Sequence, residues 1–288
     1  MYTMLLLFAS VLALVLINVP IAVSLGIVAL AAMIWSHGLN SLPNLPLVVY
    51  NGATNFPLLA IPLFILAGAI MNASGISQRL IAFASAIFGW IRGGLAHVSI
   101  GASLFFAEIS GSAVADVAAL GSIMIPGMKA KGYPAPLAAA VMSSSATLAV
   151  IIPPSIPMIL YGVAAEVSIG ELFIAGFGPG LLIGGALMVF VIVWARVKGY
   201  GKGDREGRLP VLVATRKAAL ALLMPVIILG GIYGGVFTPT EASVVAVFYA
   251  LVVGVGVYRE TRFSDLPRVL KKSVVSSAVI LFIIANAG

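Results

Sequence analysis

Long apolar runs, rarely interrupted by charge, recur along almost the whole of this 288-residue chain. Hydrophobic residues make up 61% of it and charged residues only 9%, whereas a soluble domain carries roughly 25% charged residues. Runs of about 20 apolar residues are long enough to cross a bilayer core of about 30 Å. A backbone in lipid must satisfy its own hydrogen bonds, and the short alternating strands of a barrel are absent, so the spans are helices. The sequence therefore predicts an all-α integral membrane protein, built as a polytopic helical bundle.

The basic residues are concentrated in two short segments. Seven of the sixteen lie in residues 196–217 and five more in 259–272. Such clusters are typical of cytoplasmic loops, so the net charge of +7 indicates membrane topology and contact with anionic lipid headgroups, not binding to nucleic acid. The chain has no cysteine, which excludes disulfides, thiolate metal sites and thiol catalysis. The first apolar run lacks a basic leading region and is too long for a cleaved signal peptide, so we expect it to be a membrane helix.

Taking residues 196–217 as a basic cytoplasmic loop fixes the crossings around it. The chain crosses outward over 135–163 and back over 172–195, then makes an out-and-back pair over 218–237 and 242–257. Two of these crossings begin with residues that fit a capping box. They are Ser168 with Glu171 before 172–195, and Thr238 with Glu241 before 242–257. A part in transport is the alternative role for Glu241.

We expect residues 1–75 to form N-terminal membrane helices that act as a scaffold, with Asn18, Pro20 and Gly26 kinking one long helix over 4–35. Residues 76–92 then form an amphipathic arm helix along the cytoplasmic interface, with a tilted span as the alternative. Its apolar face comprises Ile76, Leu80, Phe83, Ala84, Ile87, Phe88 and Ile91. The last apolar run, 274–288, has only fifteen residues. This is short of a span, and we expect the chain to be incomplete there.

The segment 105–122, FFAEISGSAVADVAALGS, is unusually polar for this chain. Arg92 before it and Lys129 and Lys131 after it are all expected in the cytoplasm, yet two full crossings between them need about 40 residues. A re-entrant helical hairpin over about 97–125 fits, with a break at Ser110, Gly111 and Ser112. Arms of thirteen residues reach about 20 Å at roughly 1.5 Å per residue, which places the tip near the middle of the membrane.

A second break is predicted in the helix 135–163. Pro153, Pro154 and Pro157 remove backbone donors and release carbonyls of the preceding turn. Discontinuous helices near the midplane are how secondary transporters hold ions and substrates, and hard cations prefer oxygen ligands. The two breaks offer hydroxyl oxygens at Ser110, Ser112, Ser143, Ser144, Ser145, Thr147 and Ser155.

Two carboxylates flank the hairpin tip, Glu108 and Asp116. Intramembrane acids are functional candidates, so each is expected either to couple ion or proton movement or to stabilise the hairpin by hydrogen bonding. His97 is interpreted as a structural residue of the entry region, with a proton relay as the alternative. The sequence has no HExxH zinc motif and no phosphate-binding P-loop, and a lone Ser112–His97 pair is a weak signal for an intramembrane serine protease. We therefore do not expect an enzyme, a cofactor or a metal other than a coupling ion.

Three motifs in order resemble one family. They are EISGSAVADVAALGSIMIPGMKAKGYP, SSSATLAVIIPPSIPMILYG and GGIYGGVFTPTEASVVAVFYAL, and with them essentially the whole chain resembles the large membrane subunit of TRAP transporters, the tripartite ATP-independent periplasmic transporters. The resemblance implies the elevator-type, inverted-repeat architecture of the wider ion-transporter superfamily. Residues 93–195 would hold the transport region of the first repeat, and 218–288 the start of an incomplete second repeat.

The same resemblance implies a sodium site made mostly of main-chain oxygens, at Ser110, Ser112, Ala149, Ile152 and Pro154. Ala149 stands where the family pattern leads us to expect glycine. The residues implied to border the substrate cavity are Gly111, Ser145, Thr147, Pro153 and Ser155. No organic cofactor is implied, only Na⁺ as the coupling ion.

The implied function is Na⁺-coupled uptake of a small organic anion, a carboxylate, through the inner membrane of a bacterium. The implied partners are a small four-helix membrane subunit, a periplasmic substrate-binding protein and membrane lipids. Two alternatives stay open at this point. One is a carboxylate transporter or antiporter of the same superfamily that needs no binding protein, and the other is a scaffold subunit without transport activity.

Overall fold

The computed structural model describes residues 2–199 and 209–287. Every regular element within those residues is helical. Six of the described helices are long and apolar enough to cross a membrane, or seven if one bent pair counts as a single span. The all-helical, multi-pass architecture predicted from the apolar runs is confirmed at this level.

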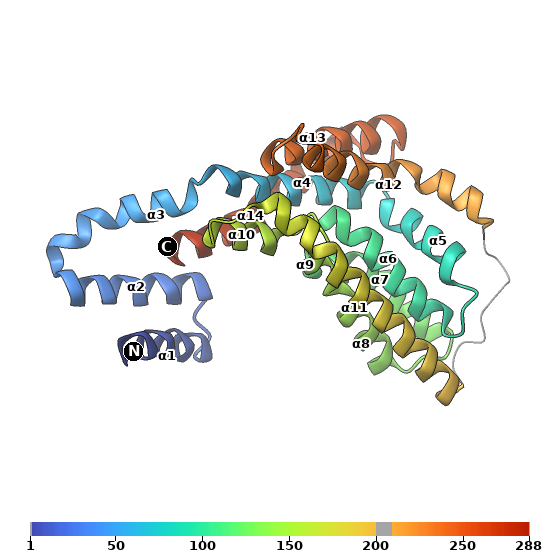
Figure 1. The fold of residues 1–288 in the computed structure, drawn as a ribbon, viewed down its shortest axis with the longest axis horizontal. Helices are drawn as coiled ribbons and strands as arrows, with labels where there is room; N and C mark the ends of the chain where they lie inside the picture. The colour runs from blue at the N-terminus through green and yellow to red at the C-terminus, as the bar shows by residue number, and fades with distance from the viewer. Residues whose placement is uncertain (1, 200–208, 288) are drawn as a thin grey trace.

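The molecule is an elongated arch of helices (Figure 1). Its N-terminal arm contains α1 (Tyr2–Leu16) and α2 (Ile21–His37), which pack against each other and run in opposite directions. The prediction of one kinked helix over 4–35 was therefore wrong. Asn18 adopts a left-handed conformation, with φ of 68°, and reverses the chain, while Pro20 is the N-cap of α2. Gly26 lies inside α2 and allows the side chain of Asn286 on α14 to approach closely.

The central layer of the arch is built on α4 (Ala60–Ala73), reached through η1 (Leu39–Asn44), α3 (Leu45–Ala53) and η2 (Phe56–Leu59). Helix α4 packs against α13 (Pro239–Leu251) and α14 (Leu266–Ala287). Helix α13 continues into a π-helical turn, η3 (Val252–Val257), and a short 3-10 turn, η4 (Phe263–Asp265), precedes α14. Segments nearly 200 residues apart in the sequence thus share one core.

The amphipathic segment after α4 forms α5 (Ile76–Phe88). Its face with Ile76, Leu80 and Phe83 is buried, because α5 packs against α6 (Gly94–Ser110) and α12 (Val211–Tyr233). Phe83 meets Phe105 of α6 with ring centroids 5.0 Å apart. The amphipathic pattern is therefore explained by contacts within the protein, and the placement of α5 at the membrane interface stays a prediction.

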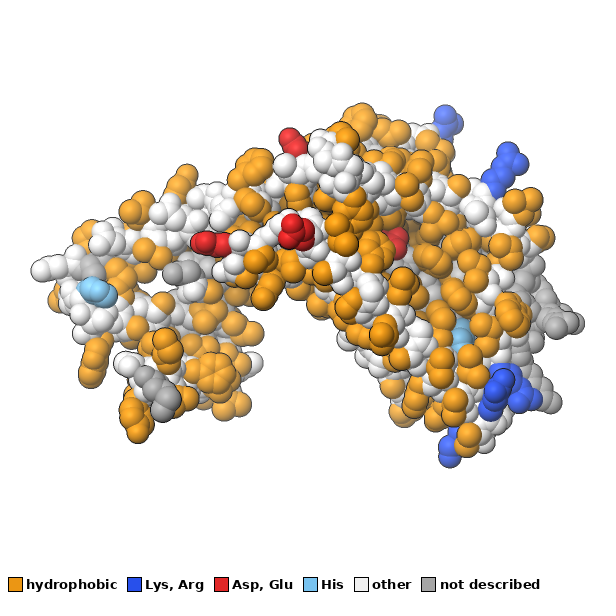
Figure 2. All heavy atoms as spheres, viewed as in Figure 1, with side chains coloured by type: hydrophobic (Ala, Val, Ile, Leu, Met, Phe, Trp, Pro, Cys, Tyr) orange, Lys and Arg blue, Asp and Glu red, His pale blue; other side chains and the backbone are white. Residues whose placement is uncertain are grey.

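Helix boundaries differ from the predicted ones near the basic segments. Helix α11 (Ile169–Lys198) includes Arg196 and Lys198, and α12 includes Arg216 and Lys217, so the described parts of the expected loop 196–217 are largely helical. Its other three basic residues, Lys202, Arg205 and Arg208, lie outside the described residues. Figure 2 shows Lys and Arg side chains gathered at one end of the visible face, while acidic side chains lie away from that end.

The last apolar run belongs to a longer helix than its composition suggested. Helix α14 begins at Leu266 and includes Arg268, Lys271 and Lys272 in its first turns. The segment Phe263–Ala287 has 25 residues and is apolar enough to cross a membrane. The interpretation of residues 274–288 as too short for a span was therefore wrong, because it started the helix after these basic residues; Gly288 itself lies outside the described residues.

The two predicted capping boxes differ in outcome. At the start of α13, Glu241 accepts hydrogen bonds from the backbone N–H and hydroxyl of Thr238, both at 2.8 Å, and the Glu241 N–H donates back to Thr238. This box is complete. At the start of α11 the Ser168 hydroxyl accepts from the Glu171 N–H at 3.3 Å, which is one half of a box.

Candidate functional site

The polar segment of the first motif folds into a helical hairpin. Helix α6 leads to the tip, and α7 (Ala113–Ala130) returns against it. Gly111 caps α6 in the left-handed conformation, with φ of 57°, and Ser112 is extended and accepts from the Ala115 N–H as the N-cap of α7. The predicted break at Ser110 to Ser112 is therefore confirmed. The arms have 17 and 18 residues, not the expected thirteen, and the depth of the tip in the membrane stays a prediction.

The second predicted break is also present. The chain forms α8 (Ala135–Ala146), α9 (Leu148–Ile151) and α10 (Ile156–Ala164), with a bend of 43° across the interruption. Pro153 has no N–H to donate to the Ala149 carbonyl, and Pro154 has none for Val150. The Ser155 hydroxyl donates to the Val150 carbonyl at 2.5 Å in place of the missing N–H. This leaves the Ala149 carbonyl without its helical partner.

The hairpin tip and the helix break are in direct contact. The Ile156 N–H, at the start of α10, donates to the Gly111 carbonyl at 3.4 Å. A Cβ atom added to Gly111 would lie 2.7 Å from the Pro154 carbonyl oxygen. On its other side the tip meets α4, where a Cβ on Gly68 would lie 3.2 Å from the Ser110 Cα atom. The tip is thus held between α4 and the break, and we call the contact of tip and break the junction.

The residues implied as sodium ligands come from the two sides of the junction. Ser110 and Ser112 lie at the tip, where the Ser112 carbonyl accepts from the Asp116 N–H at 3.0 Å, and Ala149, Ile152 and Pro154 lie at or beside the break, all three buried. Ala149 is part of the regular helix α9, so its backbone does not need a glycine. The departure from the expected glycine is therefore compatible with a carbonyl ligand, and the junction offers the oxygen chemistry that Na⁺ prefers.

The residues implied as cavity lining have different surroundings. Gly111, Pro153 and Ser155 are buried at the junction. Ser145 is buried in α8, accepts from the Ser103 hydroxyl at 3.3 Å and donates to the Met142 carbonyl. The exposed member is Thr147, whose hydroxyl donates to the Ser144 carbonyl at 2.7 Å.

Comparison with known proteins identifies the group to which these motifs belong. Residues 8–288 match the family model described as the tripartite ATP-independent periplasmic transporter, DctM component. The chain belongs to the DctM family. This confirms the resemblance that the three motifs carry, and the described helices together with this family make it a multi-pass membrane protein.

Several curated relatives carry more specific names. The C4-dicarboxylate TRAP transporter large permease protein DctM of Pseudomonas aeruginosa is 47% identical, over 86% of this chain and 58% of the relative. The sialic acid TRAP transporter large permease protein SiaM of Vibrio cholerae is 40% identical, over 93% of this chain and 62% of the relative. The isethionate TRAP transporter permease protein DctMQ of Oleidesulfovibrio alaskensis is 40% identical, over 94% of this chain and 43% of the relative. The chain thus spans about half the length of the curated relatives it matches.

Asp116 is the most unusual side chain near the junction of this DctM-family chain. It lies in the first turn of α7 and is fully buried. Ser103 of α6 faces it, but the Ser103 hydroxyl donates to Ser145, and neither carboxylate oxygen of Asp116 has a hydrogen-bond partner among the described residues. An unpaired buried carboxylate within the membrane is a candidate for a functional role, and its part in ion coupling or in hairpin stabilisation stays a prediction. Glu108, one turn before the tip, is only partly buried.

The structure separates the two residues of the weak protease signal. Ser112 lies at the hairpin tip, whereas His97 lies fifteen positions earlier near the start of α6, about 22 Å away at roughly 1.5 Å per residue. The His97 ring nitrogens lie 3.2 Å from the Gly93 carbonyl and 3.1 Å from the Met188 carbonyl. The contact with Met188 joins α6 to α11, which agrees with the structural role predicted for His97.

A glycine series on α11 was missed in the sequence. Gly176, Gly180 and Gly184 recur every four residues and face the break and the hairpin. A Cβ on Gly180 would lie 2.6 Å from the Ile152 side chain, and one on Gly184 would lie 3.2 Å from Leu104. Small residues at this spacing are a known signal for close helix packing in membranes, and here they let α11 support the broken helix.

Cysteine labelling tests the re-entrant form of the hairpin. The exposed residues Arg92 and Lys129 lie at the open end of the hairpin. In this cysteine-free chain we expect Arg92→Cys and Lys129→Cys both to react with a membrane-impermeant maleimide from the cytoplasmic side only. Val114→Cys, beside the tip and 81% exposed in the chain by itself, serves as a depth control and should resist that reagent from the cytoplasm. Labelling of positions 92 and 129 from opposite sides would instead make one arm an ordinary span.

Proposed function

We propose that this chain is the membrane permease part of a TRAP transporter that takes up a small organic anion with Na⁺. The observation that carries the proposal is the junction, in which a hairpin tip and a proline-broken helix meet through the Ile156 N–H and the Gly111 carbonyl. Paired interruptions of this kind are how secondary transporters hold ions and substrates at the midplane. Their occurrence in a DctM-family chain makes transport the function that best explains both features.

In the proposed site, main-chain oxygens of Ser110 and Ser112 on one side and of Ala149, Ile152 and Pro154 on the other hold Na⁺. The loss of the helical partner of the Ala149 carbonyl and the close approach of Pro154 to Gly111 support this assignment. When bound, Na⁺ supplies positive charge at the junction. This DctM-family chain needs no other metal or organic cofactor for such a mechanism.

The proposed substrate is an organic anion, in practice a carboxylate or a related acid. Two helix N-termini begin at the junction, that of α7 at Ala113 and that of α10 at Ile156. Helix N-termini favour negative charge through their free N–H groups and the helix dipole. The relatives named for C4-dicarboxylates, sialic acid and isethionate support an acidic substrate without selecting one, and the exposed Thr147 is the first hydroxyl we expect it to meet.

The proposed mechanism is of the elevator type. Helix α5 connects α4 to the hairpin through the turn before Gly94, while α7, α8 and α9 pack on one another around the break. The chain would thus divide into a scaffold that includes α1–α4 and a transport unit that includes α6–α11, with α5 as the arm. An inverted second repeat would supply the remaining part of the substrate cavity.

The proposed partners are a small four-helix membrane subunit and a periplasmic substrate-binding protein, and the proposed location is the inner membrane of a bacterium. The fused name of the isethionate relative, DctMQ, supports a second membrane component. Lipid contacts are expected over the many exposed apolar side chains, and no contact with nucleic acid is expected.

Uptake by the full-length subunit in proteoliposomes, together with its small subunit, tests this proposal. We expect uptake of the cognate acid to require both an inward Na⁺ gradient and the cognate binding protein. Replacing Na⁺ by K⁺, or omitting the binding protein, should reduce uptake to background. Uptake that needs Na⁺ but not the binding protein would support the binding-protein-independent alternative, and uptake indifferent to both would contradict the proposal.

A further inference from the structure

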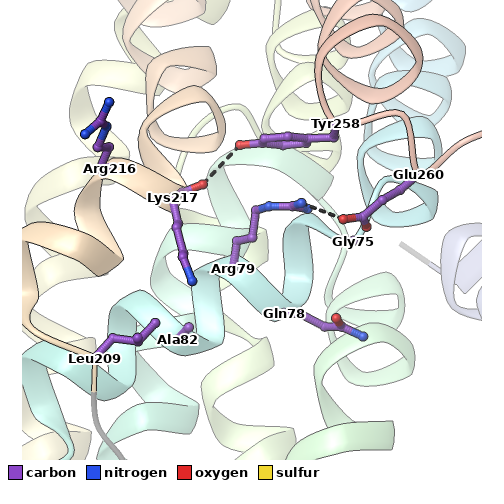
Figure 3. Close-up of a pocket in the computed structure, with 9 residues that line it drawn as sticks. All are labelled: Gly75, Gln78, Arg79, Ala82, Leu209, Arg216, Lys217, Tyr258 and Glu260. Carbon is purple, nitrogen blue, oxygen red and sulfur yellow. Dashed lines mark hydrogen bonds and ion pairs between the residues drawn. The ribbon is translucent and has the colours of Figure 1, made fainter.

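A cavity of about 500 Å³ lies apart from the junction, where α5 and α12 meet the segment that follows η3. Its lining residues are Gly75, Gln78, Arg79, Ala82, Leu209, Arg216, Lys217, Tyr258 and Glu260 (Figure 3). The described lining thus includes three basic side chains and one acidic side chain. Neither the family match nor the names of the relatives assigns a role to this region.

Glu260, the one acid among the described lining residues, is already paired. The Arg79 guanidinium donates to Glu260 at 2.5 Å and to the Ser74 carbonyl at 3.1 Å, and it stacks on the Tyr258 ring with its central carbon 3.8 Å from the ring centroid. Because Glu260 and Arg79 neutralise each other, the remaining charge of the described lining comes from Arg216 and Lys217. The described lining is therefore net positive.

The framework around these two cations is fixed by contacts between distant segments. The Tyr258 hydroxyl donates to the Lys217 carbonyl at 3.2 Å, which ties α12 to the segment after η3. The Ser74 hydroxyl lies 3.0 Å from that of Thr261, which ties the end of α4 to the same segment. Figure 3 shows the Lys217 side chain extending from α12 toward α5, beside Arg79, while Arg216 points away at the rim. The backbone from which the Lys217 side chain projects is thus held in place by contacts between distant segments.

The surroundings of the cavity fit a position at the surface of a membrane. Arg216 and Lys217 lie within the first two turns of α12, a helix long and apolar enough to span. Just before them, Val211 is 51% and Leu212 is 82% exposed. Exposed apolar side chains next to cations near the end of a span are the pattern expected of cations at headgroup depth. The lining itself is mixed, because Ala82 and Leu209 provide apolar surface beside the charged groups.

We propose that this cavity binds the headgroup of an anionic phospholipid. Lys217 would bind the phosphate and Arg216 would add positive charge at the rim, while Ala82, Leu209 and the Tyr258 ring would contact the glycerol region. The bound lipid would join α5, which leads into the hairpin, to α12. A volume of about 500 Å³ lies within the range of small-molecule sites, and the adjoining lipid-facing side chains favour a lipid over a free anion.

The test is native mass spectrometry of the purified full-length subunit with added phosphatidylglycerol, phosphatidylcholine or inorganic phosphate. We expect one phosphatidylglycerol to be retained in preference to phosphatidylcholine, and its retention to fall roughly ten-fold in Arg216→Gln/Lys217→Gln. Both residues are exposed, so the variant should fold. The matched control is Lys271→Gln/Lys272→Gln, which removes the same charge from exposed residues of α14 that do not line the cavity, and it should retain the lipid as the unmodified protein does.

Three results would overturn the proposal. Equal loss of lipid in the two double variants would show diffuse attraction to basic residues, not a site. Retention of phosphatidylcholine as strong as that of phosphatidylglycerol would show that the charge of the headgroup is not recognised. Displacement of the lipid by millimolar inorganic phosphate, with the same dependence on Lys217, would identify a site for a free anion.

Discussion

Gly111→Ala is expected to reduce Na⁺-driven uptake at least ten-fold, about what a loss of 1.4 kcal/mol produces. Two effects combine at this position. Gly111 has a φ of 57°, and the left-handed conformation costs an L-residue roughly 1–2 kcal/mol. In addition, the new Cβ would lie 2.7 Å from the Pro154 carbonyl oxygen, which is backbone and has little freedom to move. The substitution should therefore push the hairpin tip away from the helix break.

Gly132→Ala is the matched control for this prediction. Gly132 follows α7, has a φ of 84°, and an added Cβ would meet no atom within 4 Å. It carries the same conformational penalty without the contact at the junction. We expect uptake close to that of the unmodified protein for Gly132→Ala, with both variants inserted and monodisperse in detergent. A similar loss in the two variants would trace the effect to backbone strain alone, and normal uptake by Gly111→Ala would show that close contact at the junction is not required.

Much of the helical architecture follows from local sequence signals. Apolar runs long enough to span predict the membrane helices, and Pro153 with Pro154 predicts the break because neither residue can donate to the preceding turn. The hairpin required a longer argument, since it depends on counting residues between Arg92 and Lys129 and not on any local motif. Ser110 to Ser112 then gave the position of its tip.

The errors occurred where one local signal has two structural meanings. Asn18 and Pro20 lie in an apolar run without charges, and a proline in such a run is compatible with a kinked helix as well as with a turn. The left-handed Asn18 decides for the turn, and sequence alone does not reveal its φ. At α14 a continuous helix was interpreted as interrupted. Lys271 and Lys272 were taken as the boundary of the membrane helix, although charged residues are tolerated in the first turns of a spanning helix.

The contacts that form the junction and the cavity join residues far apart in the sequence, and no local sequence pattern predicts them. Gly111 and Ile156 meet across 45 positions, and Arg79 meets Glu260 across 181. A single sequence gives the chemical character of such residues but not their partners. For the proposed sodium ligands, the family resemblance supplied what the residues alone could not, and the structure adds that tip and break touch.

Asp116→Asn is the second substitution for which we expect a large effect, a loss of uptake of at least ten-fold, about 1.4 kcal/mol, with normal folding. Asparagine has the shape of aspartate without its charge. Burial of a carboxylate costs several kcal/mol unless it is compensated, and Asp116 is fully buried with both oxygens unpartnered among the described residues. If the compensating partner is the coupling cation near the tip, removal of the charge should raise the Na⁺ concentration needed for half-maximal uptake. Glu171→Gln, which neutralises an exposed acid in the first turn of α11, should leave this Na⁺ concentration unchanged.

Asp116→Leu separates ion coupling from hairpin stabilisation, the other role considered for this carboxylate. Replacing an unpaired buried polar group by an apolar side chain of similar size is neutral or stabilising, by up to about 1–3 kcal/mol. We therefore expect Asp116→Leu to have an unchanged or higher Tm and yet to be inactive in Na⁺-driven uptake. A hairpin held together by hydrogen bonds of Asp116 would behave in the opposite way, because its Tm would fall in the leucine variant. A lower Tm together with residual, Na⁺-dependent uptake would therefore assign Asp116 to the stability of the hairpin and remove it from the ion site.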